Sequence, residues 1–177
     1  MPWFSELCFE QNQKQMRRAL ATTIVLFMMA AFGEGNSLKS KQKTEIMQKE
    51  EKQKIEALLS KYKQSLNTSD AHLAQSLYTK DGIFMPTEAP SAVGSENILK
   101  SYEFIFSQIQ LNIEFYIDEI EVENDFAFAV TSSKGTTLIH ATGVTVPEAN
   151  RELFVFEKVN DEWKIARYMF NKTEPKP

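Results

Sequence analysis

The chain has 177 residues, which is the length of one domain, and its 42% hydrophobic and 25% charged residues are typical of a globular protein. A net charge of −4 argues against nucleic acid as a partner, because binding to phosphates needs a basic face. Cys8 is the single cysteine and His72 and His140 are the two histidines, so the sequence excludes an intrachain disulfide and offers no cysteine-based or histidine-rich metal site. We therefore expect neither a metal nor a cofactor.

The N-terminal residues have the order of a secretory signal. Arg17 and Arg18 precede an uncharged apolar run over residues 19–32, and small residues follow around Gly33. This run is shorter than the roughly twenty apolar residues of a membrane-spanning helix. We assign residues 1–35 as a signal peptide or a membrane anchor, with a buried helix as the third interpretation. The protein is then secreted or periplasmic, and it contacts a membrane only if this segment stays uncleaved.

Three boundaries follow from composition. Met16, directly before the two arginines, would make a more ordinary signal start than Met1, and we hypothesise that translation begins there. Residues 36–44 are polar and unpatterned, which predicts a flexible tether. The folded domain is expected over residues 45–172, with a short tail at 173–177.

Apolar residues at helical spacing predict three helices. The first begins at Glu45, and the second is short and follows a break at residues 67–70. A brief strand at 83–85 and a loop separate it from the third helix, which Ser95 is expected to cap. The expected apolar faces are Ile46, Ile55, Leu58, Leu59, Tyr62 and Leu66 in the first helix, Leu73, Ala74, Leu77 and Tyr78 in the second, and Ile98, Leu99, Tyr102, Ile105, Phe106 and Ile109 in the third.

After Gln110 the apolar period changes to two, which predicts strands. The parity shifts around Asp118 and Glu119, and this shift predicts a β-bulge that bends the sheet. Helices followed by consecutive antiparallel strands indicate the α+β class. We expect a cone-shaped, curved antiparallel sheet packed against three N-terminal helices and preceded by an export segment. The expected strands are 113–122, 126–138, 152–158 and 163–170, with a loop at 140–150.

A family resemblance is carried by residues along the whole predicted domain. They run Tyr62, Leu66-Asn67, Asp70, Leu77-Tyr78-Thr79, Asp81-Gly82, Phe84-Met85-Pro86, Val93-Gly94, Ile98 and Tyr102, and they close with Trp163-Lys164-Ile165-Ala166-Arg167-Tyr168. This order resembles the SnoaL-like branch of the nuclear transport factor 2-like superfamily, which includes ketosteroid isomerase and the polyketide cyclases. The resemblance implies the cone fold and a homodimer. It leaves enzymatic activity open, because this fold hosts isomerases, cyclases, dehydratases and non-catalytic modules.

The isomerase branch also implies a site. In its chemistry an aspartate base moves the proton, while a tyrosine and a protonated acid hold the oxyanion. Tyr62 falls at the position of that tyrosine, and Glu152 falls near that of the acid. Met85 and Pro86 stand where the base is expected and cannot take a proton, so Glu88 is a remote candidate base.

Both polar candidates have an alternative interpretation. The Tyr62 hydroxyl could instead reach solvent at the mouth of the cone. Glu152 shares the face of its strand with Phe154 and Phe156. If that face lines a cavity, burial raises the pKa of the Glu152 carboxyl; if it is the outer face, Glu152 is only a charge at a strand start. His140 is expected at the surface.

Aromatic residues suggest what the cone encloses. In a curved sheet they would line a cavity for a small hydrophobic molecule, or they would fill it. The candidate ligand-binding set is Phe84, Tyr102, Phe106, Phe115, Phe128, Phe154 and Phe156.

Two functions follow from this pattern. The first is an exported SnoaL-like domain that binds a small hydrophobic molecule and whose catalysis, where present, is of isomerase or cyclase type without metal or cofactor. The second is a non-catalytic, homodimeric interaction module that uses the outer sheet face, with Tyr116, Ile139 and Tyr168 as contact residues.

Overall fold

The computed structural model describes residues 41–173. The predicted export segment, the alternative start at Met16 and the first part of the tether lie outside the described residues. The chain divides into two compact units, Met1–Met47 and Gln48–Pro177, and the second contains the whole of the sheet. Of the first unit, residues 41–47 are described, and they are helical and exposed. No helix within 41–173 is long and apolar enough to cross a membrane.

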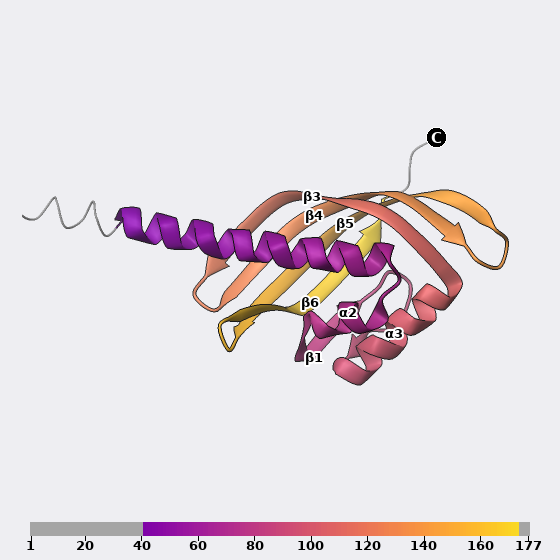
Figure 1. The fold of residues 1–177 in the computed structure, drawn as a ribbon, viewed down its shortest axis with the longest axis horizontal. Helices are drawn as coiled ribbons and strands as arrows, with labels where there is room; N and C mark the ends of the chain where they lie inside the picture. The colour runs from indigo at the N-terminus through magenta and orange to yellow at the C-terminus, as the bar shows by residue number, and fades with distance from the viewer. Residues whose placement is uncertain (1–40, 174–177) are drawn as a thin grey trace, which may run out of the picture. The chain divides into compact units, whose positions relative to one another are not determined.

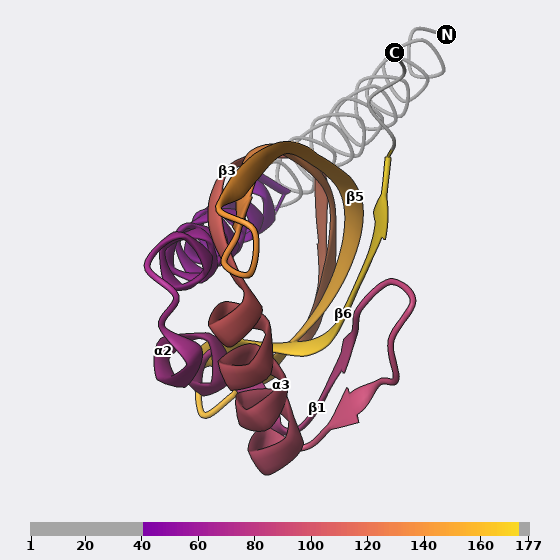
Figure 2. The ribbon, with the colours of Figure 1, turned by 90° about the vertical axis from the view of Figure 1, so that its right-hand side faces the viewer.

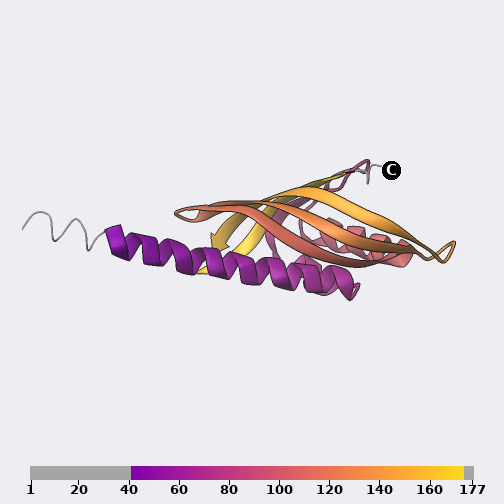
Figure 3. The ribbon, with the colours of Figure 1, turned by 90° about the horizontal axis from the view of Figure 1, so that it is seen from above.

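The first helix occupies residues 41–67, so residues 41–44, expected in the tether, are helical instead. Its buried stripe is made by Ile55, Leu58, Leu59, Tyr62 and Leu66, as the apolar spacing predicts. Residues 48–67 run along the sheet beside β3 (Ile109–Glu123) (Figure 3). Ion pairs from this helix to β3 join Lys52 to Glu121 and Lys63 to Glu114.

Two further helices lie on the concave side of the sheet (Figure 2). The helix α2 (Ala71–Ser76) is capped by Asp70, whose carboxylate accepts a hydrogen bond of 2.8 Å from the Leu73 N–H. The helix α3 (Ser95–Gln108) has Gly94 as its N-cap, so the prediction that Ser95 caps it is wrong. Gly94 has a φ of 80°, which favours glycine at this position, and the Ser95 hydroxyl donates to the Lys80 carbonyl oxygen.

Six strands form one curved sheet in the order β2-β1-β6-β5-β4-β3 (Figure 1). The α+β prediction is confirmed, with one difference: β1 runs parallel to β6, so the sheet is mixed and not wholly antiparallel. The predicted bulge is present, because the pairing of β3 with β4 shifts between Ile117 and Glu119. The remaining strands are β1 (Tyr78–Met85), β2 (Ala92–Val93), β4 (Phe126–Ile139), β5 (Val144–Val159) and β6 (Glu162–Lys172).

The loop predicted at residues 140–150 is wrong. A short turn at 140–143 is followed directly by the first half of β5. The inward positions of that half are Glu148 and Asn150, which are buried although they are polar. Because hydrophobic alternation was the signal for a strand, polar residues at inward positions hid this one.

Gly135 in β4 lies very close to the neighbouring strand β3. A Cβ atom added there would lie 2.1 Å from the Asn112 carbonyl oxygen of the neighbouring β3. No other residue fits so close an approach without a shift of backbone, since real Cβ atoms essentially never lie within 3.0 Å of another heavy atom.

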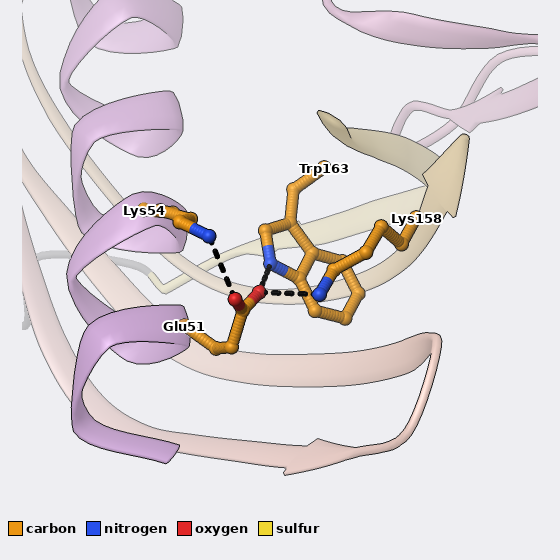
Figure 4. Close-up of polar contacts among 4 residues, drawn as sticks. All are labelled: Glu51, Lys54, Lys158 and Trp163. Carbon is orange, nitrogen blue, oxygen red and sulfur yellow. Dashed lines mark hydrogen bonds and ion pairs between the residues drawn. The ribbon is translucent and has the colours of Figure 1, made fainter. Parts of the chain in front are cut away.

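A polar cluster joins the first helix to the β5–β6 hairpin (Figure 4). The Glu51 carboxylate lies 2.6 Å from Lys158 Nζ and 2.7 Å from Lys54 Nζ, and it accepts a hydrogen bond of 2.6 Å from Trp163 Nε1. Lys158 Nζ also lies 4.9 Å from the centre of the Trp163 ring, a cation–π distance. This cluster holds the helix in place at the end of the sheet away from α3.

Candidate ligand-binding cavity

A cavity of about 100 Å³ lies between the inner face of the sheet and the helices. It is smaller than common ligand pockets of about 300–1,000 Å³ and has room for roughly three water volumes. Its apolar walls come from two groups of residues. The aromatic group is Tyr62, Phe84, Tyr102, Tyr168 and Phe170, and the aliphatic group is Leu66, Ile105, Ile109, Leu111 and Ile113.

The rings of the inner face pack mainly against one another. The ring centres of Phe154 and Tyr168 are 4.2 Å apart, and those of Phe84 and Tyr102 are 4.9 Å apart. Phe154 and Phe156 are fully buried and are not among the residues that line the cavity. The rings therefore fill most of the cone and leave one small space.

Three tyrosine hydroxyls from different elements meet beside the cavity. Tyr102 on α3 is the central one: its hydroxyl lies 2.5 Å from that of Tyr62 and 2.8 Å from that of Tyr78 on β1. Burial is the main cause that raises the pKa of all three hydroxyls well above 10, and the neighbouring tyrosines add to the rise. The three hydroxyls therefore stay protonated. Two hydrogen bonds use two of the three protons, and Tyr168, whose hydroxyl is a further hydrogen-bonding neighbour of Tyr62, can accept the third. Tyr62 and Tyr102 line the cavity.

A ladder of polar side chains forms the remaining wall. Alternate residues of β5 point inward, and their partners on β4 are Thr131 opposite Glu152 and Ser133 opposite Asn150. The Thr131 hydroxyl donates to Glu152 at 2.6 Å, and Asn150 Nδ2 donates to Ser133 Oγ at 3.2 Å. The register of β4 with β5 therefore places a row of polar groups against the apolar walls.

Glu148 continues this ladder toward the end of the sheet. Its carboxylate accepts a hydrogen bond of 2.9 Å from the Thr137 hydroxyl. It also pairs with Lys172 Nζ at 3.4 Å, and the Lys172 side chain is 60% exposed. The charge of Glu148 is therefore balanced within the cavity wall.

Glu152 differs from Glu148 because no lysine or arginine within residues 41–173 forms an ion pair with it. The residue is 4% exposed. Burial raises the pKa of its carboxyl; hydrogen bonds from Ser133 and Thr131 oppose the rise, and the charge of Asp118 adds to it. Glu152 is therefore an unpaired carboxyl that holds its proton more tightly than an exposed glutamate does.

Asn150 Oδ1 is a buried oxygen at this wall, and it accepts no hydrogen bond from the described residues. The residue is 8% exposed and lines the cavity. Such an unpaired buried acceptor costs about 1–3 kcal/mol, and a bound donor would remove this cost.

Of the predicted site residues, Tyr62, Glu152, Phe84 and Tyr102 line the cavity. Phe106 and Phe115 pack behind it against Tyr102 and Tyr62, as the core rings Phe154 and Phe156 do against their neighbours.

Two predicted residues lie elsewhere. Phe128 is 37% exposed on the opposite face of the sheet, because its strand neighbours Ala127 and Ala129 take the buried positions. Glu88 is exposed in the turn after β1, at a φ of 55°, and it does not line the cavity.

Tyr168, expected on the outer face, is buried on the inner one. The pairing of β5 with β6 shifts between Val155 and Phe156, and opposite that shift both Ile165 and Ala166 are buried. Because of this irregularity, the β6 residues after Ala166 point to the opposite face from the one that simple alternation predicts. Sequence reasoning also missed Tyr78, which it placed on a helix, and the polar residues Glu148, Asn150 and Lys172. The alternation of Glu148, Asn150 and Glu152 along the strand is the signal that could have found the polar residues of β5.

No three His, Cys, Asp or Glu side chains among the described residues converge as metal ligands would. The polar groups of the cavity are the two carboxyls of Glu148 and Glu152, the amide of Asn150, the Lys172 ammonium group and several hydroxyls. This set can bind a small molecule through hydrogen bonds, and it can donate a proton or hydrogen bond to an oxygen of that molecule.

A curved sheet packed on helices around a small inner cavity defines the class of nuclear transport factor 2-like domains. The model of the SnoaL-like domain family matches residues 55–170, so the chain belongs to that family. No curated protein matches the chain.

Solved structures of the same fold come from several bacteria. A ketosteroid isomerase-like protein from Erwinia carotovora atroseptica is 32% identical and superposes with a TM-score of 0.65, covering 68% of this chain and 95% of its own. A nuclear transport factor 2-like superfamily protein from Salmonella enterica serovar Typhimurium is 20% identical, with a TM-score of 0.63 over 71% of this chain and 93% of its own. A conserved protein from Planctomyces limnophilus is 17% identical, with a TM-score of 0.62 over 70% of this chain and 98% of its own.

Proposed function

We propose that the chain is an exported SnoaL-like domain whose cavity binds a small hydrophobic molecule. The observation that carries this proposal is the position of the cavity, enclosed by rings and aliphatic side chains and adjoining one polar wall. Export is supported by the apolar run and its two preceding arginines in residues 1–35.

The chemistry that suits this cavity is of isomerase or cyclase type. Tyr62 can donate a hydrogen bond to an oxygen of the bound molecule, and Glu152, with its raised pKa, can donate or accept a proton. The similarity to a ketosteroid isomerase-like protein supports this assignment. The position after β1 holds Pro86, so a base there would have to come from the turn that carries Glu88.

Native mass spectrometry of the mature domain, purified from the envelope fraction of its own host, tests this function. A small molecule that co-purifies and is released on denaturation is the expected result. A protein recovered from the cytoplasmic fraction with its N-terminal residues intact would contradict export. A protein without any adduct, and without affinity for small hydrophobic probes, would contradict the binding function.

A second function, a homodimeric interaction module, is favoured by the outer face of the sheet. Five large apolar side chains are exposed there, and their exposed fractions range from 37% to 56%: Tyr116, Phe126, Phe128, Leu153 and Met169. Analytical ultracentrifugation of the wild type and of Leu153→Lys tests it, because a charge at the centre of such an interface should convert a dimer into a monomer. A wild-type monomer at high micromolar concentration would exclude this function.

A further inference from the structure

The polar wall of the cavity has one acceptor that the protein itself does not use and one carboxyl that it leaves without a cation. Asn150 Oδ1 accepts no hydrogen bond within residues 41–173, and Glu152 has no cationic partner there. Lys172 is the one lysine or arginine among the lining residues, and it is paired with Glu148. The wall therefore has a net negative charge whenever Glu152 is ionised.

The Asn150 oxygen and the Glu152 carboxyl face the same space. Asn150 and Glu152 are two residues apart on β5, so both side chains point to the inner face of the sheet. The amide of Asn150 is held by its hydrogen bond to Ser133 Oγ, and the carboxyl of Glu152 is held by Thr131. Both line the cavity, so one bound group with several hydrogens can donate to both.

The apolar side of the cavity suits a cation as well as a hydrocarbon. The rings of Tyr62, Phe84, Tyr168 and Phe170 line it. The face of an aromatic ring attracts an ammonium group within about 6 Å, and the attraction is stronger where water is excluded. An anionic ligand has no comparable place, because the charge of Lys172 is neutralised by Glu148 and its side chain extends toward solvent.

We propose that the ligand of this cavity is a small amine, whose ammonium group donates to Asn150 Oδ1 and to the Glu152 carboxylate while its hydrocarbon part lies against the rings. The inference rests on the proposed function, since it requires that the cavity bind a small hydrophobic molecule. It adds the charge and the hydrogen-bonding character of that molecule. A cavity of about 100 Å³ limits the enclosed part to about four heavy atoms, because benzene with its six occupies one of about 150 Å³, and the remaining atoms of the ligand lie outside it.

Three probes with one ring and different head groups test this assignment on the full mature domain. They are cyclopentylamine, a cationic donor; cyclopentanol, a neutral donor and acceptor; and cyclopentanone, an acceptor only. Chemical-shift titrations at neutral pH in phosphate buffer measure millimolar affinities. Cyclopentylamine should bind at least about tenfold more tightly than cyclopentanone, with cyclopentanol between them.

A matched pair of variants locates the effect. Glu152→Gln keeps the shape of the side chain and removes its charge, so cyclopentylamine should lose about tenfold in affinity while cyclopentanol changes less than about twofold. Glu119→Gln removes the same charge from an exposed position of β3 and should change neither. The dispersion of the amide spectrum shows whether each variant is folded. If a variant fails to fold, the comparison of the three probes on the wild type still tests the proposal.

The outcomes separate the two proposals. Cyclopentanone binding as tightly as cyclopentylamine, or more tightly, would overturn the amine assignment and leave the binding function intact, with the tyrosine hydroxyls as the recognising groups. An amine that binds equally well to wild type and Glu152→Gln would also overturn it. If none of the three probes binds, the binding function itself is contradicted.

Discussion

Glu51 is a half-buried carboxyl group and Glu152 a buried one, and their surroundings change them in opposite directions. At Glu51, burial raises the pKa, but the hydrogen bonds from Lys158, Lys54 and Trp163 outweigh it and lower the pKa to about 2. At Glu152, burial again raises the pKa, and the hydroxyls of Ser133 and Thr131 do not outweigh it. Two lysines beside one carboxyl, and hydroxyls alone beside the other, account for the difference.

This difference separates a structural carboxyl from one available to a ligand. The charge of Glu51 is balanced where the first helix meets the β5–β6 hairpin, and Glu51 does not line the cavity. Glu152 lines the cavity and has no cation of its own among the described residues. Substituting Glu51 should therefore lower stability, whereas substituting Glu152 should mainly weaken ligand binding.

The largest expected effect is on stability, from Glu51→Gln. The substitution leaves Lys158, whose side chain is only 17% exposed, without its carboxylate partner. Removing one partner of a partly buried ion pair should cost about 2–3 kcal/mol of unfolding free energy. Urea denaturation at neutral pH measures it.

The control is Glu96→Gln, which removes the carboxylate of an exposed pair with Lys100 on α3. This pair is open to solvent, so its loss should hardly change the urea midpoint. Equal losses in the two variants would show that the Glu51 cluster is no more than another surface pair.

Acid should remove the same stabilisation from the wild type. The folded pKa of Glu51 is about 2, below its ordinary value of 4.5, so the unfolded chain binds this proton more tightly. The contribution is complete above about pH 4.5 and is lost as the pH falls toward 2. The difference in unfolding free energy between wild type and Glu51→Gln, about 2–3 kcal/mol at neutral pH, should shrink over this interval.

Urea titrations of both proteins at a series of pH values check this prediction. A difference that stays constant between pH 4.5 and the lowest usable pH would contradict it, because a pKa near 2 requires a change. The fluorescence of Trp163 would follow the protonation of Glu51 directly, since the indole N–H donates to the Glu51 carboxylate.

An intermediate effect is expected on the cavity side, from Tyr102→Phe. The substitution leaves the buried hydroxyls of Tyr62 and Tyr78 without the oxygen that links them. We expect a loss of about 1–2 kcal/mol in urea denaturation. Tyr116→Phe removes a hydroxyl from a residue that is 53% exposed, and it should change stability by less than about 0.5 kcal/mol. Equal effects would mean that the buried hydroxyls are satisfied without Tyr102.

The sequence predicted those parts of the fold that have a clear hydrophobic period. The buried stripe of the first helix, the helix α3 and the bulge at Ile117 are all visible as spacing of apolar residues. The parallel pairing of β1 with β6 was not predictable in this way, because no local pattern encodes which strand lies beside which.

The candidate site was only partly predictable. Tyr62 and Glu152 came from the resemblance to the isomerases, and the structure brings both to one cavity. Asn150 and Glu148 stayed hidden, because polar residues on an inward face look like a loop in the sequence. Tyr168 was placed on the wrong face, because the irregularity beside Ile165 and Ala166 reverses the parity and leaves no mark in composition.

The smallest effect on stability is expected from Glu152→Gln, and its sign is opposite to that at Glu51. The folded pKa of Glu152 lies above its ordinary value of 4.5, so the folded state holds this proton more tightly than the unfolded chain does. Its contribution is complete below about pH 4.5 and is lost as the pH rises through the raised pKa. Glutamine does not titrate, so the variant should gain on the wild type with rising pH, by about 1 kcal/mol or less at neutral pH.

Urea midpoints of both proteins between pH 4.5 and 7.5 measure this gain, and Glu119→Gln serves as the control for a charge removed from an exposed position. A loss of stability that grows with pH would mean that Glu152 has a cationic partner in solution, in which case its charge would be structural like that of Glu51. A gain confined to Glu152→Gln would mean that the fold tolerates an uncompensated carboxyl at its cavity. Uncompensated buried carboxyls are concentrated at functional sites, and a cation bound beside Asn150 would remove the cost of this one.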